Sequence, residues 1–509
     1  MIGLSRISLG QFKSNWRSLA YAFCRSRNLW KVRSQRLRDE NRRLRRELRQ
    51  TQQEKHSLHE RVRQLSHELK QRPTIVVEPT SSWSNLHGHQ FSAQMICLCC
   101  RLCLLVGAHA VPKVLTCIAE TFNLTMQIPS RDAVRNWSCR NGVAILGETQ
   151  SADDWVWMID HSVQLGKMFV LVVLGIRQSQ IPIGRALYRH DMTPIAVLPT
   201  NSRSKDEVNR QLSVLTKKLG MPSAIISDGA RELHEGVSKL KNEGFSGVHL
   251  DDIKHKIANL LKKRLSNDES WKLFSANLAR CTAAIQQTEL DHLLPPRKRE
   301  KGRFMDFDRL IDWATMIRHQ LSNASPSERA RLDEKFGWIN DFASALSQWK
   351  QYRHLIGETL SMANEQGVFA GASDVLHERL AQYEVQDERV RQFIEEVESF
   401  YRDNEAQLSR LNLTNVRLPC STEVLESAFG SFKALQRHHN RGTFTSLLAV
   451  FACQFDDCTP EKIRHRFARI TNKDVKTWLS TSGLTNSTQA RRTRAYREAR
   501  SIETLFCAV

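Results

Sequence analysis

The fold is decided by residues 154–176, which read DWVWMIDHSVQLGKMFVLVVLGI. Within this stretch, positions 155–159 alternate between two sets of apolar residues, and a second apolar run occupies positions 169–176. Both runs are rich in strand-forming residues, and the polar positions 161–167 between them predict a hairpin turn. Asp160 ends the first strand of this hairpin. It is either a residue that simply starts the turn or a functional carboxylate.

Further strands and a helix follow along the chain. Residues 185–200 predict a third strand. Residues 204–220 predict a helix that is capped by its first residue, a serine, and ended by its last, a glycine. A short buried strand at 224–227 ends in Asp228, and residues 248–255 predict another strand. The order is therefore three strands, a helix, a fourth strand and then a fifth.

A third carboxylate lies far downstream. Residues 421–436 predict a helix that is capped by Ser421 and carries Glu426. Lys433 follows Glu426 by seven residues, which places both side chains on one face of the helix, two turns apart. Glu423, one turn earlier on the same helix, is the alternative third acid.

Three motifs in this order resemble those of the DDE transposases of the ribonuclease-H/retroviral-integrase superfamily. They are MID at 158–160, IISDG at 225–229 and TEVLESAFGSFK at 422–433. The closest likeness is to bacterial insertion-sequence transposases that carry a long insertion before the Glu. The resemblance covers roughly residues 155–457. It implies a ribonuclease-H-like core, in which the first and fourth strands lie side by side and bring the two Asp together at their ends.

The resemblance also implies a catalytic triad and a metal cofactor. Asp160, Asp228 and Glu426 would hold two Mg²⁺ (or Mn²⁺) ions per active site. Such ions suit phosphodiester cleavage and strand transfer because they activate a hydroxyl nucleophile and stabilise the leaving oxygen. Lys433 would contact DNA near the cleaved end. Taken singly, each carboxylate has an ordinary explanation, as a turn residue for the two Asp and as a helix-surface residue for the Glu.

The N-terminal part of the chain predicts a coiled coil and a DNA-binding module. No role is readable for residues 1–32. Residues 33–72 carry a heptad pattern that predicts a coiled coil between copies of the chain, or alternatively a single charged helix. Residues 73–91 form a linker. Residues 92–145 predict three helices that resemble a helix-turn-helix module, with an ordinary helical bundle as the alternative. If the module binds DNA, three arginines of its last helix are the expected contacts: Arg131, Arg135 and Arg140.

The remaining residues complete an α+β protein of several domains. The ribonuclease-H-like core is predicted in two parts, 150–255 and 416–458. The helical patterns between these parts predict an all-helical insertion domain at 256–415. Residues 459–509 predict a basic, helical C-terminal region.

The charge of the chain indicates a polyanionic partner. Its 75 Lys and Arg against 54 Asp and Glu give a formal net charge of +21, which favours nucleic acid. The basic run at 435–442 adds Arg437 and Arg441 as expected DNA contacts. Residues 253–265 predict a basic amphipathic helix. His255 on this helix is a candidate to approach the active site, with a polar surface residue as the alternative, and Glu423 is expected near the same site.

The pattern of cysteines and the hydropathy of the chain indicate the cellular compartment in which the protein is expected. Twelve Cys are scattered without the paired spacing of a small secreted scaffold, which favours a reduced cytosol. Cysteines at 97–103 lie in an apolar helix and match no standard zinc spacing, so we favour buried core cysteines over a metal site. No run reaches the length of a membrane span, and no signal core opens the chain. We expect a cytoplasmic protein without a membrane partner, associated with the nucleoid in a bacterium.

The sequence therefore predicts a DNA transposase. It would cut double-stranded DNA at the terminal inverted repeats of an element and join them to target DNA, as a homodimer or higher homo-oligomer. Three alternatives remain: a transposase-derived DNA-binding regulator without catalysis, a structural nucleic-acid protein whose helical half oligomerises, and a ribonuclease-H-fold nuclease such as a junction resolvase. Metal-dependent nicking of DNA distinguishes the transposase from the regulator. Sensitivity of activity to Asp160→Asn distinguishes it from the structural protein, and joining of DNA strands distinguishes it from the nuclease.

Overall fold

A computed structural model shows an α+β protein with a single mixed sheet in its described residues. The description covers residues 84–484 except 166–167, 297–306, 384, 386, 412–415 and 438–443, together with isolated helical residues between 20 and 63 and between 491 and 499. Contacts divide the chain into two units, Met1–Ser82 and Trp83–Val509. The predicted coiled coil at 33–72 falls largely outside the described residues; those described within it are helical.

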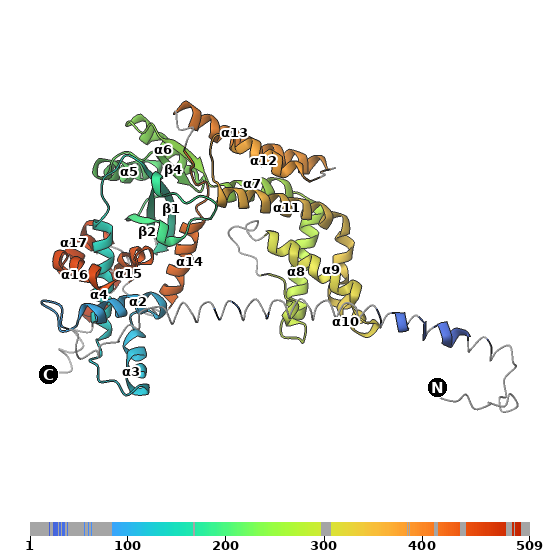
Figure 1. The fold of residues 1–509 in the computed structure, drawn as a ribbon, viewed down its shortest axis with the longest axis horizontal. Coiled ribbons are helices and arrows are strands. Elements are labelled where there is room, and N and C mark those ends of the chain that lie inside the picture. The colour runs from blue at the N-terminus through green and yellow to red at the C-terminus, as the bar shows by residue number, and fades with distance from the viewer. Residues whose placement is uncertain are drawn as a thin grey trace. The chain divides into compact units, whose positions relative to one another are not determined.

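Five strands form the sheet at the centre of the second unit (Figure 1). They are β1 (Trp155–Leu165), β2 (Met168–Arg177), β3 (Thr193–Thr200), β4 (Ala224–Ser227) and β5 (Val248–Asp251). Their spatial order is β3-β2-β1-β4-β5. The first three strands are antiparallel, whereas β4 runs parallel to both β1 and β5. The expectation that the first and fourth strands are neighbours is confirmed.

The register of β1 and β4 sets the position of the two Asp. Ile159 lies opposite Ser227, so Asp160 and Asp228 each follow directly after this pair. Because the two strands are parallel, both residues come at the same end of the sheet.

The predicted turn at 161–167 is wrong for most of its length. Strand β1 continues past Asp160 to Leu165, with His161 opposite Leu171 and Ser162 opposite Val170. The polar character of these positions suggested a turn, but the long apolar strand β2 supplies pairing partners for them. The pairing becomes irregular only between Ser162 and Leu165. Asp160 is therefore an interior residue of a strand and does not start a turn.

Helices cover both faces of the sheet. One face of β1, with Trp155, Trp157 and Ile159, packs in a core with helices α5 (Lys205–Leu219) and α6 (Arg231–Asn242). Val156 and Met158 face the opposite side, where they share the main core with α7 (Ile253–Leu265). The alternation read from the sequence thus corresponds to a strand buried on both faces.

The boundaries of α5 agree with the prediction. Ser204 caps the helix, accepting a hydrogen bond from the backbone N–H of Glu207 (3.3 Å). Gly220 follows the last turn with φ +88°, a conformation that favours glycine.

The stretch between β5 and the Glu426-bearing helix is helical, as predicted. It contains α7, α8 (Glu269–Ile285), α9 (Phe307–Asn323), α10 (Pro326–Phe336), α11 (Ala343–Glu365), α12 (Ala372–Ala381) and α13 (Glu388–Arg410). These helices share one continuous hydrophobic core with a face of the sheet. The chain then returns to the sheet, where the backbone N–H of Ile253 donates to the carbonyl of Cys420 (2.9 Å), and enters α14 (Glu423–Arg437).

The helices before and after the core pack together. The N-terminal ones are α2 (Ala93–Val106), α3 (Val111–Thr121) and α4 (Arg131–Gly147); the C-terminal ones are α15 (Phe444–Val450), α16 (Pro460–Arg469) and α17 (Asn472–Thr481). Ile463 and Phe467 of α16 share a core with α2 and α4, which includes Val134 and Trp137 of α4. Helices from the predicted regions 92–145 and 459–509 therefore share one core. Their apolar faces cover one another.

The cysteines of α2 are core residues, as predicted. Cys97, Cys99, Cys100 and Cys103 are all buried, and Cys458 from the C-terminal segment joins the same core. By length and composition, none of the described helices could cross a membrane on its own, although α2 and α3 pass that test as a pair bent by 114°.

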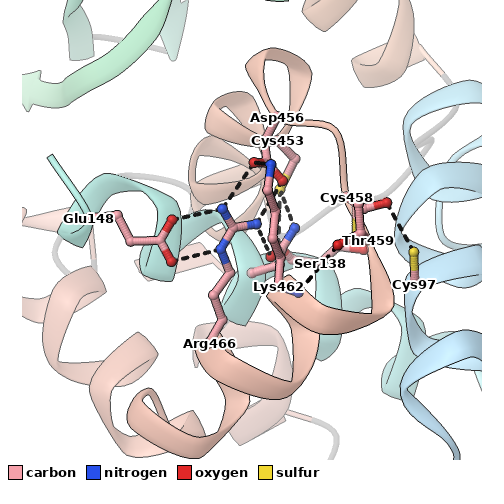
Figure 2. A network of polar contacts seen from close by, with 10 residues as sticks. Cys97, Ser138, Glu148, Cys453, Asp456, Cys458, Thr459, Lys462 and Arg466 are labelled. Atoms are coloured by element: carbon pink, nitrogen blue, oxygen red, sulfur yellow. Dashed lines mark hydrogen bonds and ion pairs between the residues drawn. The ribbon is translucent and has the colours of Figure 1, made fainter.

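A buried arginine joins the C-terminal helices to α4 (Figure 2). The Arg466 guanidinium, 3% exposed, donates two hydrogen bonds to Glu148 (2.7 and 2.8 Å) and two to Asp456 (2.7 and 3.0 Å). It also donates to the side-chain oxygen of Asn141 (3.1 Å). A buried charge is tolerated only when it is paired in this way.

Replacing Arg466 with Lys should destabilise the protein by about 2 kcal/mol, because one ammonium group cannot satisfy two carboxylates in the planar geometry of a guanidinium. The free energy of unfolding in denaturant measures the effect. The same substitution at Arg464, which is exposed on the same helix and pairs at 3.4 Å with Glu461, is the control and should change little. Equal effects at both positions would contradict a stabilising role for the network.

Candidate active site

Three carboxylates from distant parts of the chain meet at one end of the sheet. Asp160 comes from β1, Asp228 follows β4, and Glu426 lies in the first turn of α14. Burial, followed by the negative charge of Asp228 and a smaller contribution from Glu426, raises the pKa of Asp160 to about 8. Since like charges influence one another only at short range in a protein, this shift reflects the closeness of the three acids.

The turn after β4 holds Asp228. Its Oδ1 accepts a hydrogen bond from the backbone N–H of Ala230 (2.9 Å), and Gly229 between them has φ +77°. Burial raises the pKa of Asp228 despite this bond. The carboxylate thus serves the turn, as its ordinary explanation requires, and also contributes negative charge to the cluster.

Two basic side chains of α7 face Glu426. The ammonium of Lys254 lies 3.4 Å from Glu426 Oε2 and 3.4 Å from Glu423 Oε1, and His255 Nε2 lies 3.7 Å from Glu426 Oε1. Glu426 is 27% exposed and Glu423 54%. Glu426 is therefore the more enclosed acid and the one whose charge acts on Asp160.

His255 is placed to carry a proton at neutral pH. Burial alone would lower its pKa, but the interactions with Asp252 and the charges of Glu426 and Asp228 together raise it to about 9. Its Nδ1 lies 3.5 Å from Asp252 Oδ2, an ion-pair distance longer than a good hydrogen bond. The imidazolium therefore lies among the carboxylates and partly balances their charge.

A buried carboxylate, Asp252, connects α7 to α14. Its Oδ1 caps α7 by accepting from the backbone N–H groups of Lys254 (2.6 Å) and His255 (3.2 Å). Its Oδ2 accepts from the backbone N–H of Thr422 (2.7 Å) and from the Thr422 hydroxyl. Burial would raise the pKa of Asp252, yet the interactions with His255 and Thr422 hold it below its usual value. One side chain thereby fixes both helices that face Asp160.

Sequence reasoning did not identify Asp252 or Lys254. Residues 248–255 were predicted as a strand, but the strand ends at Asp251. The helix predicted at 253–265 is confirmed as α7, with the same bounds. A signal was present, since an Asp directly before a segment with helical apolar spacing is a typical N-cap. The second partner of Asp252, Thr422, lies 170 residues away and left no local signal.

The donor atoms suit a hard divalent cation, but Glu426 is otherwise engaged. Carboxylate oxygens are the ligands that Mg²⁺ prefers, and the raised pKa values of the half-buried Asp160 and Asp228 are those of acids that a bound cation would stabilise in their charged form. However, no group of three or more His, Cys, Asp or Glu in the described part of the chain is arranged to hold a metal ion. Glu426 is paired with Lys254 and His255. Metal binding at this site therefore requires Glu426 to turn away from these two partners.

The predicted DNA contacts fall into three groups. Arg131 and Arg135 are exposed in the first turns of α4, each 3.5 Å from Asp132, and so remain open to a ligand. Lys433 and Arg437 are exposed on α14. Arg441 lies outside the described residues.

The prediction that Arg140 contacts DNA is wrong. Its side chain is 7% exposed, and its guanidinium donates to the backbone carbonyls of Phe467 and Ile470. The guanidinium carbon also lies 4.2 Å from the centre of the Phe467 ring. Because α4 continues to Gly147 and is covered by α16 and α17, this arginine binds the C-terminal helices.

A scan against protein-family models found no match for this chain, and a search of curated proteins likewise found no similar sequence. The chemistry of the site is therefore inferred from the carboxylates, the cations beside them and the strands and helices that hold them.

Proposed function

We propose that the protein is a DDE transposase, which cuts DNA at the ends of an element and joins those ends to target DNA. The observation that carries the proposal is the parallel pairing of β1 with β4. This pairing brings Asp160 and Asp228 to one end of the sheet, opposite Glu426. The strand order supports a ribonuclease-H-like core, and the motif resemblance covers the same three carboxylates.

In this proposal the chain's own residues bind the cofactor and the scissile phosphate. Asp160, Asp228 and Glu426 would hold Mg²⁺ or Mn²⁺, which when bound activates the attacking hydroxyl and stabilises the leaving oxygen. His255 and Lys254 keep positive charge next to Glu426 and can attract the phosphate of the DNA backbone. Asp252 keeps both helices in place while the substrate binds.

Other parts of the chain would bind and pair the DNA ends. Arg131 and Arg135 on α4 are exposed and suit phosphate or base edges, and Lys433 and Arg437 extend a basic face along α14. A coiled coil at 33–72 would join two or more copies of the chain. Two linked copies would hold two DNA ends at a high effective concentration. The proposed partners are double-stranded DNA and a second copy, in the cytoplasm or on the nucleoid of a bacterium.

Excision and reinsertion of a marked element, with the DNA that flanks this gene as its ends, tests the proposal. Wild type should move the element, and Asp160→Asn, Asp228→Asn and Glu426→Gln should not. Glu423→Gln is the matched control, since it removes a charge one turn away on the same helix and should leave movement intact. Loss of movement with Glu423→Gln but not with Glu426→Gln would assign the third carboxylate to Glu423. Cutting by wild type without any joining would favour a nuclease.

The pairing of Glu426 with Lys254 and His255 favours a second candidate, a DNA-binding regulator without catalysis. In that case these two ion pairs persist, and the carboxylate cluster has only a structural role. Binding of the element ends with no cleavage in Mg²⁺ or Mn²⁺ would support the regulator and reject the transposase.

A further inference from the structure

The segment between β2 and β3 carries a stack of exposed rings. The rings of Tyr188 and His190 lie nearly parallel, with centres 5.6 Å apart and an interplanar angle of 14°. Tyr188 is 55% exposed, and the side chain of His190 is 65% exposed. The Arg185 guanidinium carbon lies 5.2 Å from the centre of the Tyr188 ring.

Hydrogen bonds fix the arginine and the backbone turn that carry this stack. The Arg185 guanidinium donates two bonds to Asp191 (both 2.7 Å), and Asp191 also accepts from the backbone N–H of Tyr188 (2.7 Å). The turn closes with a bond from the backbone N–H of Asp191 to the Tyr188 carbonyl (3.1 Å). The backbone of this turn is therefore already ordered before a ligand binds the rings.

The stack is also fixed to the helix that carries Glu426. Arg189, between the two rings in sequence, donates to the carbonyl and hydroxyl of Ser427 (2.8 and 2.9 Å) and to the hydroxyl of Ser431 (2.7 Å). Ser427 directly follows Glu426 in the chain. At its start the segment is anchored by a bond from the Gly184 N–H to the carbonyl of Glu365 (2.8 Å).

We propose that the Tyr188–His190 stack is a binding site for an unpaired nucleobase of the DNA held at the carboxylate site. Every base has a flat face that stacks on an aromatic ring, and such stacking contributes about 1–3 kcal/mol per base. The base must be unpaired, because a base inside a duplex has no free face. The inference rests on the proposed function for the source of the DNA, but it concerns binding alone.

Binding of two DNA probes to the full-length protein in EDTA tests the site without cleavage. One probe is a blunt duplex. The other is the same duplex with a short single-stranded overhang that contains 2-aminopurine, whose fluorescence falls when it stacks. Tyr188→Ala should weaken binding of the overhang probe by about 5- to 100-fold and abolish the quenching, with less than about a twofold change for the blunt probe. Tyr188→Phe should retain both properties.

The control is Ile183→Ala, which truncates an apolar side chain of the same segment that is 72% exposed. It should leave both probes unaffected. The proposal would be overturned if Tyr188→Ala weakened binding of the blunt and overhang probes equally, or weakened neither. It would also be overturned if the substitution changed only the self-association of the chain. If Tyr188→Ala selectively weakened binding of the overhang probe, but the protein never cut or joined DNA, the transposase proposal would be rejected and the base-binding site would still be supported.

Discussion

Replacing Asp160 with Asn is expected to abolish DNA cleavage and, at the same time, to stabilise the metal-free protein. If the proposed function holds, cleavage should fall by at least about 10³-fold, since the amide cannot replace a carboxylate in the proposed metal site. Stability should rise because Asp160 lies half-buried beside Asp228, and the loss of hydration and that charge raise its pKa to about 8. A residue retained only for stability would not show this opposition of effects.

The pKa shift of Asp160 predicts how the stability difference between Asp160→Asn and wild type changes with pH. The folded pKa of Asp160, about 8, lies above its value of about 3.9 in an unfolded chain, so the folded protein binds the proton more tightly. The stability due to this group is fully present below about pH 4 and is lost progressively as the pH rises to about 8. The amide introduced by Asp160→Asn does not titrate. The variant should therefore match wild type near pH 4 and exceed it by roughly 2 kcal/mol or more at pH 9.

Thermal unfolding in EDTA across this pH range, followed by addition of Mg²⁺ or Mn²⁺, measures both effects. A divalent cation should stabilise wild type at pH 8 and leave Asp160→Asn unchanged, because binding to the folded state adds to its stability. The control is Asp153→Asn, an exposed acid just before β1 that should respond to neither pH nor metal in this way. A lower melting temperature for Asp160→Asn at pH 9 would contradict the assignment of a destabilising, functional carboxylate.

Local patterns predicted the parts of the fold that local sequence controls. The apolar runs of β1 and β2, the serine and glycine that bound α5, and the helical spacing after β5 all appear in the structure. Parallel pairing of the first and fourth strands followed from the order of these elements. That pairing predicts Asp160 and Asp228 at one end of the sheet, which the register of β1 and β4 confirms.

Predictions failed where a partner far along the chain decides the outcome. The polar residues after Asp160 remain in a strand because β2 pairs with them. Arg140 lies on the face of α4 that the C-terminal helices cover, and its partner Ile470 is 330 residues away. The sequence of a helix does not show which of its residues are exposed when the segment that covers it is not known. For the same reason Asp252 looked like the end of a strand, although its role depends on Thr422.

Replacing Asp252 with Ala is expected to cost about 3–5 kcal/mol of stability and to release the start of α14. The substitution leaves the N–H groups of Lys254, His255 and Thr422 without their acceptor in a buried place, and it removes one of the two carboxylates that pair with the His255 imidazolium. Since the backbone N–H of Glu426 donates to the carbonyl of Thr422 (3.1 Å), a displaced Thr422 shifts Glu426 as well. Both stability and cleavage should therefore fall.

Denaturant unfolding and hydrogen exchange within residues 423–437 show whether Asp252 acts on α14 through Thr422 or whether its loss only weakens packing in general. Thr422→Val keeps the shape of the side chain and removes only its hydroxyl donor, so it should cost about 1.5–3 kcal/mol, less than Asp252→Ala. Asp251→Ala is the matched control: the neighbouring carboxylate is half-buried, and its Oδ1 has no hydrogen-bond partner in the described structure. If Asp251→Ala costs as much as Asp252→Ala, or if exchange at the start of α14 does not change, then Asp252 does not hold Glu426. If stability and protection at the start of α14 fall only in Asp252→Ala, then Asp252 positions Glu426 through Thr422, which lies 170 residues away in the chain.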